Sequence, residues 1–111
     1  MTEGDVVLAP LAQANGGIKN RPALVLHRMP PFGDLLICGI SSQLRQAVVG
    51  FDEIIEPADA DFPSSGLKTA SVIRLGFLAV FPTSHFIGSI GAISPERHRR
   101  LLTRLSDHLR P

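Results

Sequence analysis

Residues 18–28 read IKNRPALVLHR and join a polar, glycine-containing loop to an apolar run through a single Arg-Pro step. Pro22 has no backbone N–H and a fixed φ, so it marks the exposed first step of a predicted strand at 21–27. The aliphatic residues after Pro22 indicate that this strand becomes buried. A charged guanidinium, that of Arg21, is therefore mounted rigidly beside a loop whose adjacent glycines allow positive φ.

The rest of the chain continues as short apolar runs separated by Gly, Pro, Asn and Asp, without an internal repeat. This alternation predicts a mainly β protein, a small barrel. Residues 47–56 are interpreted as a strand pair or one bent strand, because Gly50 indicates a bulge or sharp bend. Residues 69–81 predict one or two strands interrupted at Gly76. The other predicted elements are strands at 5–11, 21–27 and 35–40, a loop at 12–20, a hairpin turn at 29–34, and a loop or short helical turn at 57–66.

The hydrophobic period changes near the end of the chain, where Ser94 is suited to cap a helix. Pro95 fits the first helical turn, and Glu96 favours the positive end of the helix dipole. Leucines then recur at helical spacing, so we predict a C-terminal amphipathic helix with one apolar stripe, formed by Leu101, Leu102, Leu105 and Leu109. Its other face is expected to be solvated, with contact to a polyanion as the alternative. That face carries Arg97, Arg99, Arg100 and Arg104.

Composition predicts one packed domain spanning residues 1–111. Hydrophobic residues make up 44% of the chain and charged residues 19%, which excludes a disordered tail. The net charge is +1, so any site for an anion must be local. Cys38 is a lone cysteine in an apolar run, which indicates a small buried hydrophobe and a reducing cytoplasm. No apolar stretch approaches the length of a membrane span, so no membrane partner is expected.

Arg21 is the first candidate for chemistry, because the chain contains no standard enzyme motif. The four histidines lie far apart in the sequence, so neither a metal site nor a cofactor is expected. An arginine fork binds phosphate oxygens at two points and can offset charge that develops on a transferred phosphorus. The competing interpretation of Arg21 is an ordinary exposed salt bridge.

Several segments in this order resemble the MazF/PemK family of toxin endoribonucleases: GDVVLAPL, KNRPALVL, LLICGISSQ, GLKTASVIRLGFL and IGAISPERHRRLLTRL. The resemblance implies a small SH3-like β-barrel with a C-terminal helix, usually a homodimer with RNA in a groove near the dimer interface. It also implies metal-independent cleavage of single-stranded RNA. In that reaction the ribose 2′-hydroxyl attacks the adjacent phosphate and leaves 2′,3′-cyclic phosphate and 5′-hydroxyl ends. The implied partner is an antitoxin protein whose acidic, disordered segment folds as it enters the groove.

The same resemblance implies roles for individual residues. Arg21 matches the arginine of the Arg-Pro motif, assigned to proton transfer or to stabilising the phosphorane. Ser41 stands where the family usually has threonine, and its hydroxyl can donate a hydrogen bond to a phosphate oxygen. Gln43 and Arg74 match positions that contact RNA. Further candidates for RNA contact in the same motifs are Lys19, Asn20 and Ser42.

Two departures from the family pattern leave a second function open. Several members have a glutamate a few residues before the Arg-Pro motif, but residues 12–20 contain no carboxylate. Some members have an aspartate where this chain has Gly76. His27 and His85 are possible replacement bases, because imidazole titrates near neutral pH. The alternative function is a non-catalytic relative that binds RNA or an antitoxin-like peptide, and a barrel used only for protein contacts is a third possibility. Residues 82–93 are predicted to form either an interface or barrel core.

Overall fold

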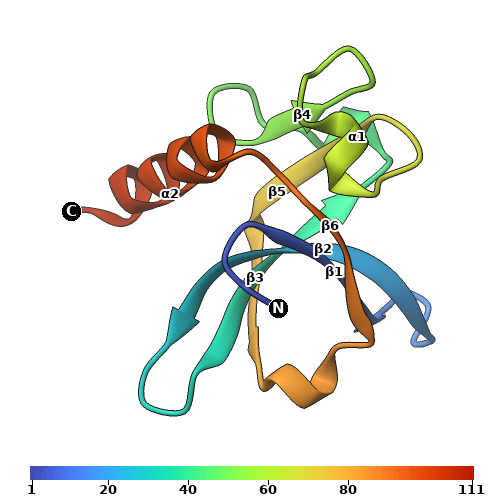
Figure 1. The fold of residues 1–111 in the computed structure, drawn as a ribbon, viewed down its shortest axis with the longest axis vertical. Coiled ribbons are helices and arrows are strands. Elements are labelled where there is room, and N and C mark those ends of the chain that lie inside the picture. Colours follow the sequence, from blue (N-terminus) through green and yellow to red (C-terminus); the bar gives the residue numbers. More distant parts are fainter.

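The computed structural model describes residues 1–111 as an antiparallel sheet curled into a half-barrel, with one long helix across one end (Figure 1). The order of the six strands is β4-β5-β3-β2-β1-β6. The strands are β1 (Asp5–Ala12), β2 (Ile18–Met29), β3 (Asp34–Ser41), β4 (Glu53–Ile55), β5 (Ser71–Phe81) and β6 (Gly88–Ala92). The helices are α1 (Phe62–Ser65) and α2 (Pro95–Leu109), with short 3-10 turns η1 (Leu44–Gln46) and η2 (Thr83–His85). The predicted mainly β fold with a C-terminal helix is confirmed.

The curled sheet packs against a hydrophobic core on each of its two faces, and alternate residues of a strand contribute to different cores because successive side chains point to opposite faces. Val6 of β1 belongs to a core that includes Leu101 of α2, whereas Val7 belongs to a second core that includes Phe86. Cys38 is fully buried in the first core, as predicted, and burial raises the pKa of its thiol. This double burial explains the continuous apolar runs of β1 and β2.

Helix α2 begins as its sequence predicts. Ser94 Oγ accepts a hydrogen bond from the backbone N–H of Arg97 at 3.1 Å, and Pro95 occupies the first turn. Leu101 and Leu105 of the predicted stripe are buried against the sheet. Leu109, the last residue of α2, is exposed. The stripe therefore packs only along its first turns.

Two predicted boundaries are wrong. Only Glu53–Ile55 of the segment 47–56 forms a strand, because Asp52 Oδ2 accepts from the backbone N–H of Val48 at 2.9 Å and fixes a turn instead. Gly50 lies in that turn with a φ of +82°. Strand β2 also begins upstream of the Arg-Pro step, since residues 18–20 pair with residues 10–12 of β1. Pro22 is tolerated inside β2 because pairing with β3 starts only at Ala23.

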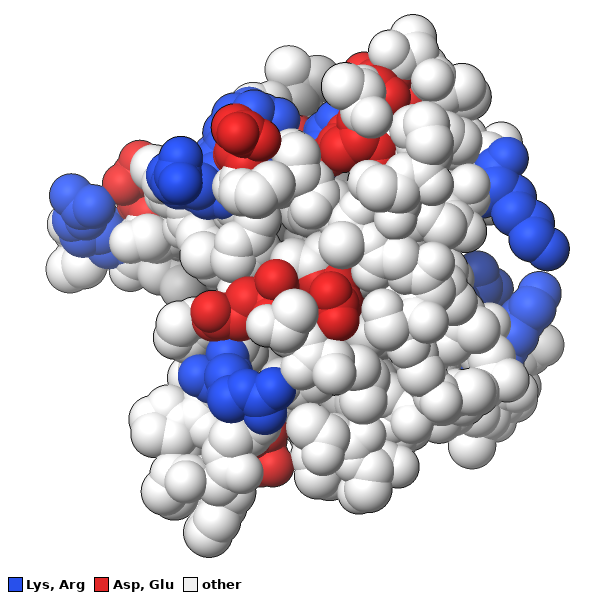
Figure 2. All heavy atoms as spheres, viewed as in Figure 1, with Lys and Arg blue, Asp and Glu red and all other residues white.

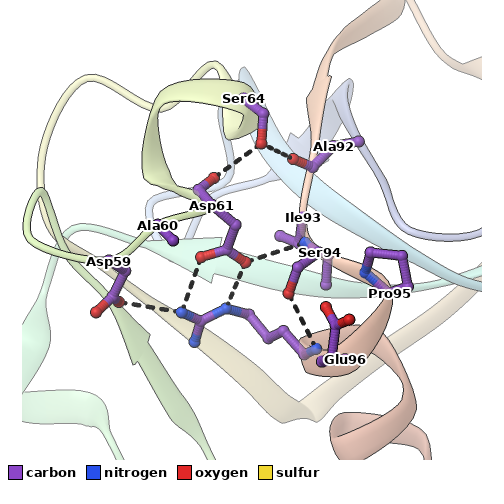
Figure 3. A pocket seen from close by; sticks show the side chains of 10 residues that line it. Asp59, Ala60, Asp61, Ser64, Ala92, Ile93, Ser94, Pro95 and Glu96 are labelled. Atoms are coloured by element: carbon purple, nitrogen blue, oxygen red, sulfur yellow. Dashed lines mark hydrogen bonds and ion pairs between the residues drawn. The ribbon is translucent and has the colours of Figure 1, made fainter.

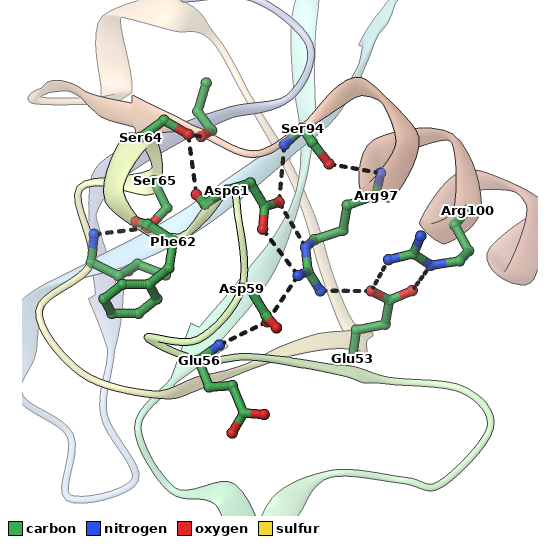
Figure 4. Close-up of polar contacts among 12 residues, drawn as sticks. Glu53, Glu56, Asp59, Asp61, Phe62, Ser64, Ser65, Ser94, Arg97 and Arg100 are labelled. Carbon is green, nitrogen blue, oxygen red and sulfur yellow. Dashed lines mark hydrogen bonds and ion pairs between the residues drawn. The ribbon is translucent and has the colours of Figure 1, made fainter.

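The expected solvated face of α2 is wrong for Arg97. Its guanidinium is buried between three carboxylates from other elements, at 2.8 Å from Glu53 Oε1, 3.0 Å from Asp59 Oδ2 and 2.8 Å from Asp61 Oδ2 (Figure 4). Arg100 and Arg104 also reach Glu53, at 2.7 and 3.3 Å. These carboxylates lie at least 36 residues away in sequence, so the arginine pattern alone suggested solvent.

The ion-pair network of α2 shifts the pKa values of its buried acids. The hydrogen bond from Arg97 lowers the pKa of Asp61 from 3.8 to about 2. Burial alone would raise the pKa of Glu53, but Arg100, with Arg104 and Arg97, lowers it overall. Both carboxylates are therefore held in their charged form and fasten α2 to β4 and to the segment that precedes α1.

Residues 82–93 divide between core and surface. Phe86 and Ile93 are buried, while Ile87 is 61% exposed. Strand β6 lies at one edge of the sheet and packs against α1, where Ser64 Oγ donates to Ala92 O at 3.0 Å (Figure 3). The core interpretation is thus confirmed for Phe86 and Ile93, and the interface interpretation stays a prediction for the exposed residues.

Substituting Gly91 with alanine should lower the free energy of unfolding by about 2–3 kcal/mol. A Cβ at Gly91 would collide with the backbone of Ser64 and Ser65, whereas a Cβ at Gly88 of the same strand would meet nothing within 4 Å. Gly88→Ala is therefore the matched control, and urea unfolding of both variants measures the difference. Equal stability of the two variants would show that the contact between α1 and β6 adjusts freely.

Candidate functional site

A polar recess of about 380 Å³ lies where β3 ends, between the ends of β1 and β2 and the middle of β5. Four of the residues singled out in the sequence line it: Arg21, Ser41, Gln43 and Arg74. The sheet order explains why they meet. Strand β3 lies between β2 and β5, so Arg21 from one neighbour and Arg74 from the other flank the end of the central strand.

Arg21 is held in the recess by an amide. Its Nη2 donates to Gln13 Oε1 at 2.5 Å, and Gln13 Nε2 donates to the carbonyl of Leu11 at 3.4 Å. The loop that carries Gln13 is closed by backbone hydrogen bonds to Gly16 and Gly17, of 3.0 and 2.7 Å. Gln13 was not singled out from the sequence. The one indication in the sequence that Gln13 could belong to the site is its position in the loop before the Arg-Pro step.

A hydroxyl and two amides occupy the end of β3. Ser41 Oγ accepts a hydrogen bond from the backbone N–H of Gln43 at 3.1 Å, which turns the chain out of the strand and into η1. The hydroxyl proton of Ser41 keeps its capacity to donate to a ligand. Gln46, another residue that the sequence did not single out, also lines the recess. These groups are suited to hydrogen bonds with phosphate or base atoms.

Other candidates from the sequence lie outside the recess. Lys19, Asn20 and Ser42 are exposed beside it and do not line it. His27 pairs with Glu3 at 2.5 Å. His85 places Nε2 3.2 Å from the carbonyl oxygen of Pro10 and stacks its ring on Phe81. The recess therefore contains neither candidate imidazole.

The charge of the recess distinguishes it from a larger pocket beside α1. Two arginines and no carboxylate line the recess. The pocket of about 550 Å³ beside α1 is lined by Asp59, Asp61 and Glu96, and its Asp61 carboxylate is already bound by Arg97 and by the N–H of Ser94 (Figure 3). Figure 2 shows charges of both signs mixed over α2, and basic side chains without acidic neighbours at the right-hand edge.

No group of three or more His, Cys, Asp and Glu side chains is arranged to hold a metal ion.

Comparison with known proteins gives the chain a family. The model of the PemK-like, MazF-like toxins of type II toxin-antitoxin systems matches residues 2–109. The chain belongs to this toxin family. Among solved structures, the chain is similar to the Mycobacterium tuberculosis toxin MazF-mt6, with a TM-score of 0.67 and 18% sequence identity over 93% of each chain. No curated protein matches it in sequence.

Membership confirms the resemblance to the MazF/PemK family that the five segments of the sequence indicate, and the likeness to MazF-mt6 agrees with the fold. A type II toxin implies an antitoxin partner. No helix of this MazF-like chain has both the length and the apolar character needed to cross a membrane.

Proposed function

We propose that this chain is the toxin of a type II toxin-antitoxin system and a metal-independent, sequence-selective endoribonuclease. Residues 1–111 would form one domain that acts in the cytoplasm as a homodimer, cleaves single-stranded mRNA and so inhibits translation. The observation that carries the proposal is the convergence of Arg21, Arg74, Ser41 and Gln43 in one recess without a carboxylate. Such a recess favours the binding of an anion, and each phosphodiester group of RNA is an anion.

The proposed reaction is an attack of the ribose 2′-oxygen on the neighbouring phosphorus. The new bond to the 2′-oxygen forms as the bond to the 5′-oxygen breaks; the 2′-hydroxyl loses its proton and the departing 5′-oxygen gains one. Arg21 and Arg74 bind the non-bridging oxygens and offset the charge that builds up on the phosphorane. Ser41 donates a further hydrogen bond, and Gln43 orients the RNA.

The remaining candidates would contact RNA beyond the cleaved phosphate. Lys19 and Asn20 extend along β2 from Arg21, and Ser42 follows Ser41 at the rim of the recess. All three are exposed, so the ionic contact of Lys19 with a phosphate would be screened by salt more strongly than contacts within the recess. Groups at such a rim are suited to hold the strand in register while the recess holds the phosphate.

The test is cleavage of a long single-stranded RNA by the purified chain in EDTA, with the new ends mapped. We expect cuts at a short recurring sequence that leave 5′-hydroxyl and 2′,3′-cyclic phosphate ends. The matched control is an oligonucleotide with a single 2′-deoxy substitution at the mapped nucleotide, which removes the attacking oxygen and should resist cleavage. Products with 5′-phosphate ends, or cleavage of the deoxy control, would contradict the mechanism.

A second candidate function is an RNA-binding or antitoxin-binding module without catalysis. The observation that favours it is that neither a carboxylate nor an imidazole lines the recess, so no side chain there is an efficient proton acceptor near neutral pH. Saturable binding of single-stranded RNA by a chain that leaves the RNA intact would support this function and reject the nuclease.

Introducing a carboxylate beside Arg21 should weaken RNA binding. Gln13→Glu would pair directly with the guanidinium and compete with the phosphate, because Gln13 Oε1 already lies 2.5 Å from Arg21 Nη2. With an uncleavable 2′-fluoro oligoribonucleotide, the slope of log K against log salt should shrink by about 0.7, the value for one phosphate contact on a single strand. Gln13→Met, similar in size and neutral, should keep the slope. An unchanged slope in the glutamate variant would mean that Arg21 does not contact phosphate.

A further inference from the structure

The side chain of Phe77 is a large apolar group placed among the polar groups of the recess. It lines the same recess as Arg21 and Arg74, and it is 38% exposed. Phe86 belongs to one of the two hydrophobic cores, and Phe51, Phe62 and Phe81 pack against them, but Phe77 belongs to neither core. Core packing therefore does not account for its position.

A β-bulge brings Phe77 into the recess. Cys38 pairs with Leu78 and the next residue, Gly39, pairs with Arg74, so residues 75–77 of β5 bulge out against β3. In a regular strand, Arg74 and Phe77 would point to opposite faces, because they are an odd number of residues apart. The bulge changes this alternation and allows both side chains to line one cavity.

The rest of the fold supports this bulge. The backbone N–H of Leu75, which lies outside the regular ladder, donates to Asp52 Oδ1 at 2.9 Å. On β3, a Cβ at Gly39 would lie 3.1 Å from Phe77 Cδ1, so the absence of a side chain there lets the ring lie close to the strand. Asp52 and Gly39, from two different parts of the chain, thus accommodate the bulge and the ring of Phe77.

We propose that Phe77 is a stacking platform for a nucleobase next to the phosphate held by Arg21 and Arg74. The inference rests on the proposed function only in taking single-stranded RNA as the ligand. Aromatic side chains beside a cationic groove bind successive bases by stacking, and every base offers a π-face, so the contact adds affinity with little sequence preference. The arginines would hold the backbone while Phe77 holds the base.

The chain contains no tryptophan or tyrosine, so Phe77→Trp introduces a single fluorescent reporter at the proposed platform. The probes are 2′-fluoro homo-oligoribonucleotides of eight nucleotides, one for each base, and an abasic phosphodiester of equal length. We expect the base-containing oligomers to quench the indole fluorescence of this variant saturably and the abasic oligomer to leave it unchanged. Phe32→Trp is the matched control, since Phe32 is 86% exposed in the turn at the opposite end of β2 and should not respond.

A second variant measures the affinity that stacking supplies. Phe77→Leu keeps an apolar side chain but removes the ring, and it should weaken binding of the base-containing oligomers about tenfold while binding of the abasic oligomer stays the same. Circular dichroism of the variant checks that it is folded. Equal losses for both oligomers would overturn the proposal, because they would indicate a general disturbance of the recess.

The outcomes separate this inference from the nuclease proposal. Quenching in Phe77→Trp without RNA cleavage by the wild type would support the stacking platform and reject the nuclease. Cleavage or binding without quenching would overturn the platform and leave the nuclease standing. Failure of every oligomer to bind would overturn the platform, while the nuclease proposal is decided by cleavage of the long RNA. Quenching of the introduced indole by a protein partner alone would assign Phe77 to a protein contact instead.

Discussion

Arg21→Ala is expected to lower the rate of RNA cleavage by about a thousandfold. The substitution removes the fork that would bind the phosphorane, and loss of one such donor or arginine costs about 10²–10⁵ in rate in other enzymes. The expected loss lies within that range because Arg74 remains in the recess and supplies a second positive charge. Single-turnover cleavage of a mapped oligonucleotide measures the effect on chemistry separately from the effect on binding.

Two companion variants sharpen the test of Arg21. Arg21→Lys keeps the charge but loses the planar fork, so its rate should fall between those of the wild type and the alanine variant. Arg99→Ala removes an exposed arginine of α2 outside the recess and should leave the rate unchanged. A wild-type rate in Arg21→Ala would exclude this residue from the reaction, and an equal loss in Arg99→Ala would point to general attraction of RNA.

The second large effect is expected on stability. Arg97→Met should lower the free energy of unfolding by about 3–5 kcal/mol, because it leaves the buried carboxylate of Asp61 without a cationic partner and leaves Glu53 with only Arg100 and Arg104. Methionine fills a similar volume, so the loss reports the lost ion pairs more than a cavity. Arg99→Met, on the same helix and exposed, is the control and should change stability by less than about 0.5 kcal/mol. Equal urea midpoints for the two variants would contradict a structural role for the network.

The same network predicts how stability depends on pH. In the folded chain Arg97 lowers the pKa of Asp61 from 3.8 to about 2, so the stabilisation from this acid is complete above about pH 4. It is lost as the pH falls towards 2, because the unfolded chain takes up its proton first. Glu53, whose pKa is also lowered, should add to the loss in the same direction. Urea unfolding between pH 5 and pH 2 should show a steeper decline for the wild type than for Arg97→Met, and parallel declines would contradict the assignment.

Helix α2 and residues 47–52 show how local and distant residues differ in what they determine. Ser94, Pro95 and Glu96 predict the start of α2 correctly, because a helix cap is made within one turn of the chain. The predicted exposure of Arg97, in the same turn, is wrong, because its ion-pair partners come from β4 and from the segment before α1. The strand predicted at residues 47–52 is wrong for a similar reason. Asp52 accepts hydrogen bonds from the backbone N–H groups of Val48 and of Leu75 in β5, which is distant in sequence.

The candidate site also combines residues that local motifs identify with residues that only the tertiary structure brings into place. The Arg-Pro and Ser-Ser-Gln segments name Arg21, Ser41 and Gln43 in the sequence, and the fold brings these three residues to one recess. No sequence motif points to Gln13 or Phe77 as a site residue. Gln13 matters because a closed loop aims its amide at Arg21, and Phe77 matters because a bulge changes the face to which it points.

The sequence by itself determined the mainly β fold, the C-terminal helix and the toxin family, because strand period, helix capping and short motifs depend on residues close together in the chain. The tertiary structure alone decided which distant side chains share the recess, which arginine of α2 is buried, and where the ring of Phe77 lies. These outcomes depend on strand order, register and burial, which are set by contacts between residues far apart in sequence.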